Sequence, residues 1–120
     1  MTRQAFWGAA LALAAAGPAA AQTDVTGRCP QGFLVARVTP QPQSGGRFLY
    51  LVTFRNGSTL PVSLRLVNAG RQTSLPGGRF EGSQTPQPVG ARGEATLAAL
   101  STSGSVGEPL IRAALTYACG

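Results

Sequence analysis

The stretch from Arg47 to Val67, RFLYLVTFRNGSTLPVSLRLV, constrains the fold of this chain more than any other part of it. Two runs rich in β-branched and aromatic residues, Phe48–Phe54 and Val62–Val67, lie on either side of an Asn-Gly-Ser sequence at positions 56–58. Such runs, bounded by Asn, Gly, Ser and Pro, are typical of strands that bury one face. The sequence therefore predicts a domain built around two β-strands in this region.

The side-chain pattern of the two runs also predicts how they are connected. Successive side chains of a strand face opposite sides, and the apolar alternation consists of Phe48, Tyr50, Val52 and Phe54 in the first run and of Val62, Leu64 and Leu66 in the second. A two-residue Asn-Gly hairpin would pair the runs with these two faces on opposite sides of the sheet. Pro61 also cannot donate a hydrogen bond within a ladder. We therefore expect residues 56–61 to form an arch between two packed sheets.

The N-terminus has the three parts of a secretory signal peptide. Arg3 supplies a positive charge, Ala5–Ala16 is an apolar segment, and the alanines at 19–21 supply the small residues of a cleavage site. We predict a signal peptide at residues 1–21, cleaved before Gln22, and a periplasmic or secreted domain at residues 22–120. A retained membrane anchor is the alternative, but a transmembrane helix needs about 20 apolar residues, and the Gly-Pro sequence at 17–18 interrupts this segment earlier. No stable membrane insertion is expected after cleavage.

The predicted domain contains two cysteines, Cys29 and Cys119, near its two ends. In an exported protein such a pair is expected to form a disulfide. The alternative is a pair of free thiols in redox or metal chemistry, but the chain has neither a CxxC motif nor a histidine. We predict a structural Cys29–Cys119 bond that stabilises the fold by about 4–5 kcal/mol in the chain-entropy model.

Further short strands are expected on both sides of the central pair. The candidates are Phe33–Thr39, Arg71–Leu75, Arg79–Glu81, Glu94–Leu100 and Leu110–Cys119. Glu94–Leu100 has the composition of a helix, but its shortness and its surroundings favour a strand with Ala95, Leu97 and Ala99 on one face. About seven short strands with frequent turns predict an all-β fold, a single small β-sandwich.

Two motifs carry a resemblance to a known family. The run VTFRNGSTLPVSLRL resembles the strand–turn–Pro-Val–strand pattern of small exported bacterial immunoglobulin-like domains, and Tyr117-Ala118-Cys119 is similar to their Tyr-x-Cys sequence. The resemblance implies an immunoglobulin-like β-sandwich over residues 22–120. The chain departs from the pattern because its single tryptophan, Trp7, lies in the leader and no strand follows Tyr-x-Cys. The resemblance therefore implies an architecture and no functional residue.

The composition argues against catalysis. The chain has no histidine and no lysine, and its acids are isolated in the sequence: Asp24, Glu81, Glu94 and Glu108. The commonest general base and metal ligand, the amine for a Schiff base, and an adjacent carboxylate pair are therefore all missing. We predict a protein that is not an enzyme and has no catalytic residue, no metal site and no cofactor.

The arginines are the remaining chemical signal. Ten basic residues, all of them arginine, stand against four acids, and the formal net charge is +6. Contact with an anionic partner, such as a lipid head group, an acidic glycan or an acidic protein, is one interpretation. The other is a solvated surface with no binding role, which the absence of an arginine run favours. Nucleic acid is not an expected partner, because no aromatic residues are interleaved with the basic ones.

Two functions are consistent with these observations. The first is an exported binding or assembly module that holds another periplasmic or surface protein by strand addition at a sheet edge. The predicted edge is Leu110–Thr116, a long run without an internal proline, and its docking residues would be Leu110, Arg112, Ala114 and Thr116. The alternative is a secreted inhibitor or anion-binding surface protein that acts through its arginines.

Overall fold

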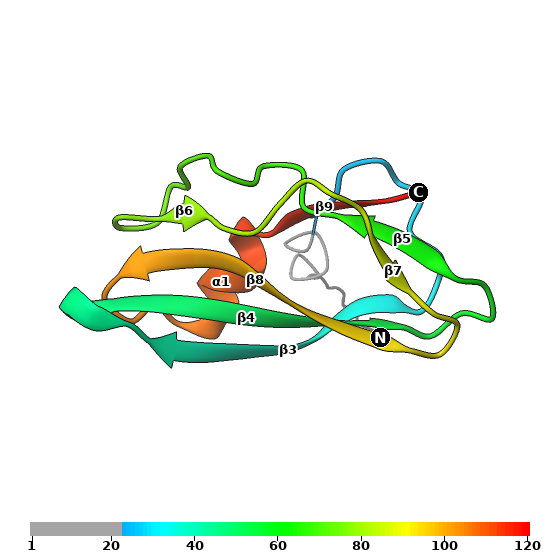
Figure 1. The fold of residues 1–120 in the computed structure, drawn as a ribbon, viewed down its shortest axis with the longest axis horizontal. Helices are drawn as coiled ribbons and strands as arrows, with labels where there is room; N and C mark the ends of the chain where they lie inside the picture. The colour runs from blue at the N-terminus through cyan, green and yellow to red at the C-terminus, as the bar shows by residue number, and fades with distance from the viewer. Residues whose placement is uncertain (1–22) are drawn as a thin grey trace, which may run out of the picture.

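The computed structural model describes residues 23–120, which form two facing four-stranded sheets (Figure 1). The predicted signal peptide and its cleavage site lie outside the described residues. The first sheet has the order β3 (Phe33–Pro42), β4 (Arg47–Asn56), β8 (Glu94–Ser103) and β6 (Arg79–Phe80). The second has the order β2 (Thr23–Asp24), β9 (Thr116–Cys119), β5 (Val62–Arg65) and β7 (Gln87–Val89). The predicted all-β sandwich is confirmed.

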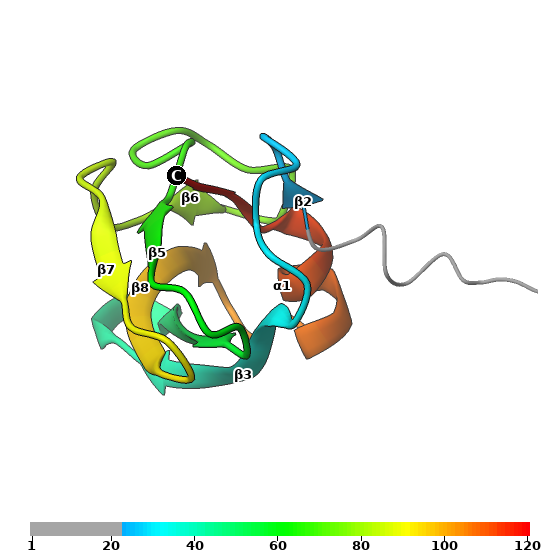
Figure 2. The same cartoon turned by 90° about the vertical axis from the view of Figure 1, so that its right-hand side faces the viewer.

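Neighbouring strands of both sheets are antiparallel, except that β2 runs parallel to β9. Two short helical segments complete the described chain: a 3-10 turn at Ser44–Gly46, which joins β3 to β4, and helix α1 (Glu108–Ala114), which precedes β9. Seen along the long axis, α1 fills one open side of the sandwich, between β3 and the second sheet (Figure 2). None of the helices within residues 23–120 is long and apolar enough to cross a membrane.

The core lies between the two sheets and is formed by the predicted alternation. Tyr50, Val52 and Phe54 of β4 and Leu64 of β5 are at most 2% exposed, and all belong to one cluster with Leu66. The rings of Phe33, Phe54 and Tyr117 meet there, with the centroids of Phe54 and Tyr117 5.2 Å apart in an edge-to-face arrangement. Aromatic pairs of this kind stabilise a core beyond their buried area.

The predicted arch is confirmed, because β4 and β5 lie in different sheets. The side chain of Asn56, at the end of β4, is fully buried and organises the arch with both ends of its amide. Its Nδ2 donates to the carbonyl oxygens of Leu60, Val89 and Gly90, at 2.8, 3.3 and 3.2 Å. Its Oδ1 accepts from the backbone N–H and the hydroxyl of Ser58, at 3.0 and 2.7 Å. A polar side chain can be buried in this way only because its hydrogen bonds are satisfied.

Strand β3 is longer than the sequence predicted, since it continues through Pro40 and Pro42. The backbone N–H of Gln43 donates to the carbonyl oxygen of Arg47 at 2.7 Å. The backbone N–H and C=O groups of Gln43, and of every second residue before it, therefore point toward β4. The intervening positions, which include both prolines, therefore face away from β4. A proline at an outward position costs no ladder hydrogen bond, and this is why the strand does not stop at residue 39.

The strand predicted over Leu110–Cys119 is wrong for most of its length. Residues 108–114 form helix α1, and only Thr116–Cys119 is a strand. Pro109 lies at the start of the helix, where its missing N–H costs nothing, and Glu108 and Arg112 form an i,i+4 ion pair at 2.8 Å. A run of almost continuous apolar residues is compatible with the 3.6-residue period of a helix and with the two-residue period of a strand. Here Glu108 and Pro109, at the first positions of the segment, favour the helix.

Three smaller differences occur around β6. Residues 71–75 contain one bridge, between Gln72 and Arg79, instead of a strand. Strand β7 was not expected, because residues 82–88 contain two prolines, but it is a three-residue edge strand. Strand β8 extends to Ser103, beyond the expected end at residue 100. The choice of a strand for Glu94–Leu100 is confirmed, with Ala99 in the core and Ala95 and Leu97 partly buried against it.

Candidate functional site

The predicted disulfide is present and joins the segment before β3 to the end of β9. The Cα atoms of Cys29 and Cys119 are 4.9 Å apart, and the bond closes a sequence separation of 90 residues. The carboxylate of Asp24 holds the loop that leads to Cys29, accepting hydrogen bonds from Thr26, Gly27 and Cys29. Burial alone would raise the pKa of Asp24, but these hydrogen bonds together outweigh it and hold the pKa below its ordinary value.

The same loop affects one aromatic core residue. Burial raises the pKa of the Tyr117 phenol, and the negative charge of Asp24 raises it further. Tyr117 is next to Asp24 in the register of β9 and β2. This end of the sandwich therefore contains both the disulfide and the Asp24 carboxylate, which accepts from the N–H of Cys29 at 2.8 Å.

The structure does not provide the docking edge predicted from the sequence. Leu110, Arg112 and Ala114 lie in α1, so they offer no row of free strand hydrogen-bonding groups. Thr116 lies in β9, which has β2 on one side and β5 on the other. Strand addition at Leu110–Thr116 is therefore incompatible with this fold.

The long edge strand of the first sheet is β3, and it is protected. Arg112 of α1 donates from Nη1 to the carbonyl oxygen of Val35 at 2.9 Å, beside the irregularity in pairing between Val35 and Arg37. Further along, Pro40 and Pro42 remove the donors that a new strand would need. Bulges, prolines and covering helices are the known ways of blocking edge pairing. Arg112, predicted as the rim of a docking edge, instead caps an edge.

The arginines divide into two groups according to their partners. Arg37 and Arg55 both lie near the carboxylate of Glu94, at 3.6 and 3.5 Å, and Arg112 pairs with Glu108. Within residues 23–120 no carboxylate lies within 4.0 Å of the remaining guanidinium groups, which belong to Arg28, Arg47, Arg65, Arg71, Arg79 and Arg92. An arginine without a carboxylate partner leaves its charge uncompensated and so can pair with an anionic group of another molecule.

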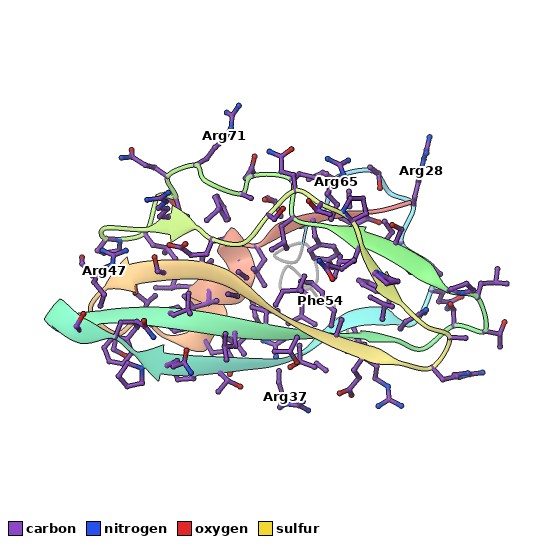
Figure 3. The ribbon with its side chains drawn as sticks, in the orientation of Figure 1. Arg28, Arg37, Arg47, Phe54, Arg65 and Arg71 are labelled. Atoms are coloured by element: carbon purple, nitrogen blue, oxygen red, sulfur yellow. A yellow bond between two sulfur atoms is a disulfide. The ribbon has the colours of Figure 1, made fainter. Side chains whose placement is uncertain are left out.

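Three of the unpaired arginines share one long side of the molecule. In Figure 3, Arg28 and Arg65 lie near β5 and β9, and Arg71 lies on the same upper side over the loop that leads to β6, whereas Arg37 extends from the opposite side. We call these three residues the arginine face. Arg28 and Arg65 flank a hollow of about 150 Å³, whose other walls include Ser63 and Cys119. Local sequence pattern does not indicate this grouping, because the three positions are spread over 44 residues of chain (28 to 71, inclusive).

A larger hollow, of about 480 Å³, lies beside β6. Its lining is formed by Arg47, Gln72, Thr73, Leu75, Gly77, Gly78, Arg79 and Glu81. Arg47 donates from Nη2 to the carbonyl of Gly77 at 3.1 Å and to Oγ of Ser101 at 2.9 Å. Ser101 in turn donates to the carboxylate of Glu81 at 2.7 Å. We call this the Arg47–Arg79 hollow. Sequence reasoning missed it, because Arg47 and residues 72–81 are distant in the sequence and meet only in the folded sheet.

Two glycines determine the wall of the Arg47–Arg79 hollow. Gly77 has a φ of +58°, in the left-handed region that favours glycine. A Cβ atom on Gly78 would lie only 1.8 Å from Oγ1 of Thr73, which itself accepts from the N–H of Leu75 at 3.0 Å. The loop can therefore close against Thr73 only because a glycine occupies position 78.

Among residues 23–120, no group of three or more His, Cys, Asp or Glu side chains is placed to hold a metal ion. No protein-family profile matches the chain, and no solved structure matches it. The chain is 30% identical over 105 residues to the large ribosomal subunit protein uL2 of Pyrobaculum neutrophilum. That similarity covers 86% of this chain but only 38% of the relative. The immunoglobulin-like resemblance of the sequence stays a prediction.

Proposed function

We propose that this protein is an exported, non-enzymatic binding module that holds an acidic partner protein on its arginine face. The observation that carries the proposal is the position of Arg28, Arg65 and Arg71 on one side of the sandwich, without a carboxylate partner in the described chain. A positive surface attracts a negative one and orients it during encounter. The module binds through a side-chain surface, since its long edge is capped by Arg112 and the outward prolines.

Export is supported by the Cys29–Cys119 bond, because disulfides persist in oxidising compartments and are rare in the cytosol. The arginine face lies next to that bond: Arg28 directly precedes Cys29, and Arg65 lines the same hollow as Cys119. The disulfide therefore keeps the two backbone segments that carry Arg28 and Arg65 close to each other. A fixed support reduces the ordering cost of binding.

The experiment compares two triple variants that have the same net charge. Arg28→Gln/Arg65→Gln/Arg71→Gln removes the arginine face, and Arg37→Gln/Arg55→Gln/Arg92→Gln removes three exposed arginines elsewhere. Binding of each to an immobilised glutamate-rich peptide is measured at low and high salt. Exposed ion pairs contribute about 0.5 kcal/mol each, so the face variant should bind about tenfold more weakly, while the control should change far less. Equal losses in the two variants would show that only net charge matters and would refute the proposal.

RNA is a second candidate for the anionic partner, because the similar protein uL2 is named as a component of the large ribosomal subunit. A single-stranded RNA oligonucleotide is therefore titrated in parallel with the acidic peptide. RNA binding through phosphates would show a steep salt dependence. Tighter binding of RNA than of the peptide, lost in the face variant, would favour this second candidate.

A further inference from the structure

We propose that the Arg47–Arg79 hollow is a binding site for an acidic sugar, a hydroxylated ring that carries one carboxylate. The hollow uses none of the residues of the arginine face. Its volume of about 480 Å³ lies in the range of about 300–1,000 Å³ that small-molecule sites occupy. The site shares no lining residue with the proposed protein-binding surface, so the side chains of each can be substituted without changing those of the other.

The lining chemistry identifies the ligand class. Arg79 is exposed and has no carboxylate within 4.0 Å in the described residues, so it is available to a negative group. Glu81, Gln72 and Thr73 supply a carboxylate, an amide and a hydroxyl, which together suit the donors and acceptors of several sugar hydroxyls. A neutral sugar would offer no negative group to the guanidinium of Arg79. A multiply charged phosphate would be repelled by Glu81, and the lining contains no aromatic ring on which a nucleobase could stack.

The second guanidinium is held in place before any ligand arrives. Arg47 uses Nη2 for both of its hydrogen bonds, to Gly77 and to Ser101, while the Glu81 carboxylate accepts from the same Ser101 hydroxyl. The other two nitrogens of the guanidinium make no hydrogen bond within residues 23–120. A donor fixed by its own neighbours loses little entropy on binding. In the loop that lines the hollow, the backbone N–H of Thr73 donates to the carbonyl oxygen of Gly78 at 2.9 Å.

A second hollow extends the site. It has a volume of about 350 Å³ and shares Arg47 and Glu81 with the first, while Gln43, Ser44, Leu49 and Ser101 complete its lining. Two adjoining hollows with a common arginine and a common carboxylate have the layout of neighbouring subsites. The ligand could come from two sources, which differ in the space they occupy. A free acid would occupy one hollow, and an acidic glycan chain would occupy both.

The test is a titration with galacturonic acid, followed by the backbone amide signals of the protein. Saturable changes should appear at residues 72–79. Galactose and the methyl ester of galacturonic acid have nearly the same shape without the charge, and should bind about tenfold more weakly or not at all, since hydrogen bonds to charged groups are the stronger ones. Oligogalacturonate should bind more tightly than the monomer if the source is a glycan, and no more tightly per unit if it is a free acid.

Substitutions test whether sugar binding depends on the residues of this site or only on the net charge of the protein. Arg79→Gln should weaken galacturonate binding by about tenfold or more, while the matched control Arg92→Gln should leave it unchanged. The triple variant of the arginine face should bind the sugar normally. Absence of saturable changes at 72–79, equal binding of acid and ester, or equal losses for Arg79→Gln and Arg92→Gln would each overturn the proposal.

Discussion

Asn56→Ala should be among the most destabilising polar substitutions in this domain. The Asn56 amide is fully buried and connects the arch, at Ser58 and Leu60, to the end of β7, at Val89 and the adjoining Gly90. Alanine removes every one of these hydrogen bonds. It also leaves the carbonyl of the buried Val89 without the Asn56 amide as a donor.

The magnitude follows from the number and burial of the hydrogen bonds. A typical hydrogen bond contributes about 1 kcal/mol net, and a buried group left unsatisfied costs about 1–3 kcal/mol. Two of the contacts of Nδ2 are longer than 3.1 Å, and three acceptors share its two hydrogens, so the five contacts count as fewer full bonds. We expect Asn56→Ala to lower the free energy of unfolding by about 3–4 kcal/mol.

The control is Asn68→Ala, which removes one part-buried hydrogen bond, from Nδ2 of Asn68 to Oγ1 of Thr116 at 2.8 Å. It should cost about 1 kcal/mol. Urea unfolding of the oxidised protein, followed by far-UV circular dichroism, measures both variants. A loss for Asn56→Ala no larger than that for Asn68→Ala would show that the arch does not depend on this amide, and the reasoning would be wrong.

Three further predictions concern the core, the disulfide and Asp24. Phe54→Ala, at a fully buried position, should lower the free energy of unfolding by about 3–5 kcal/mol, and Leu49→Ala, at a half-buried one, by distinctly less; urea unfolding that ranks them in reverse would contradict the packing. Reduction of the Cys29–Cys119 bond should destabilise the domain by about 4–5 kcal/mol in the chain-entropy model, and an unchanged melting temperature in reductant would contradict this. The folded-state pKa of Asp24 is lowered, so its stabilisation is complete above the unfolded value of about 3.9 and is lost as pH falls through the folded value. Urea midpoints measured across this acid range should fall less in Asp24→Asn than in the parent.

The sequence by itself determined the features that depend on local pattern. The alternation of Tyr50, Val52 and Phe54 identified the buried face, and its conflict with a tight Asn-Gly hairpin led to the arch between sheets. Both conclusions rest on the two-residue period of a strand, which is independent of its neighbours. The pairing of Cys29 and Cys119 followed from there being two cysteines in a chain with an export signal pattern.

Only the tertiary structure decided which edges and surfaces are available. The apolar run before β9 fits a helix as well as a strand, and docking of α1 beside β3, with Arg112 on the carbonyl of Val35, makes the helix part of the edge protection. The Arg47–Ser101–Glu81 contacts unite residues from β4, β8 and the segment after β6, which are neighbours only through sheet order. Local pattern contains no information about such long-range pairings, since they are set by which strands meet across the sheet.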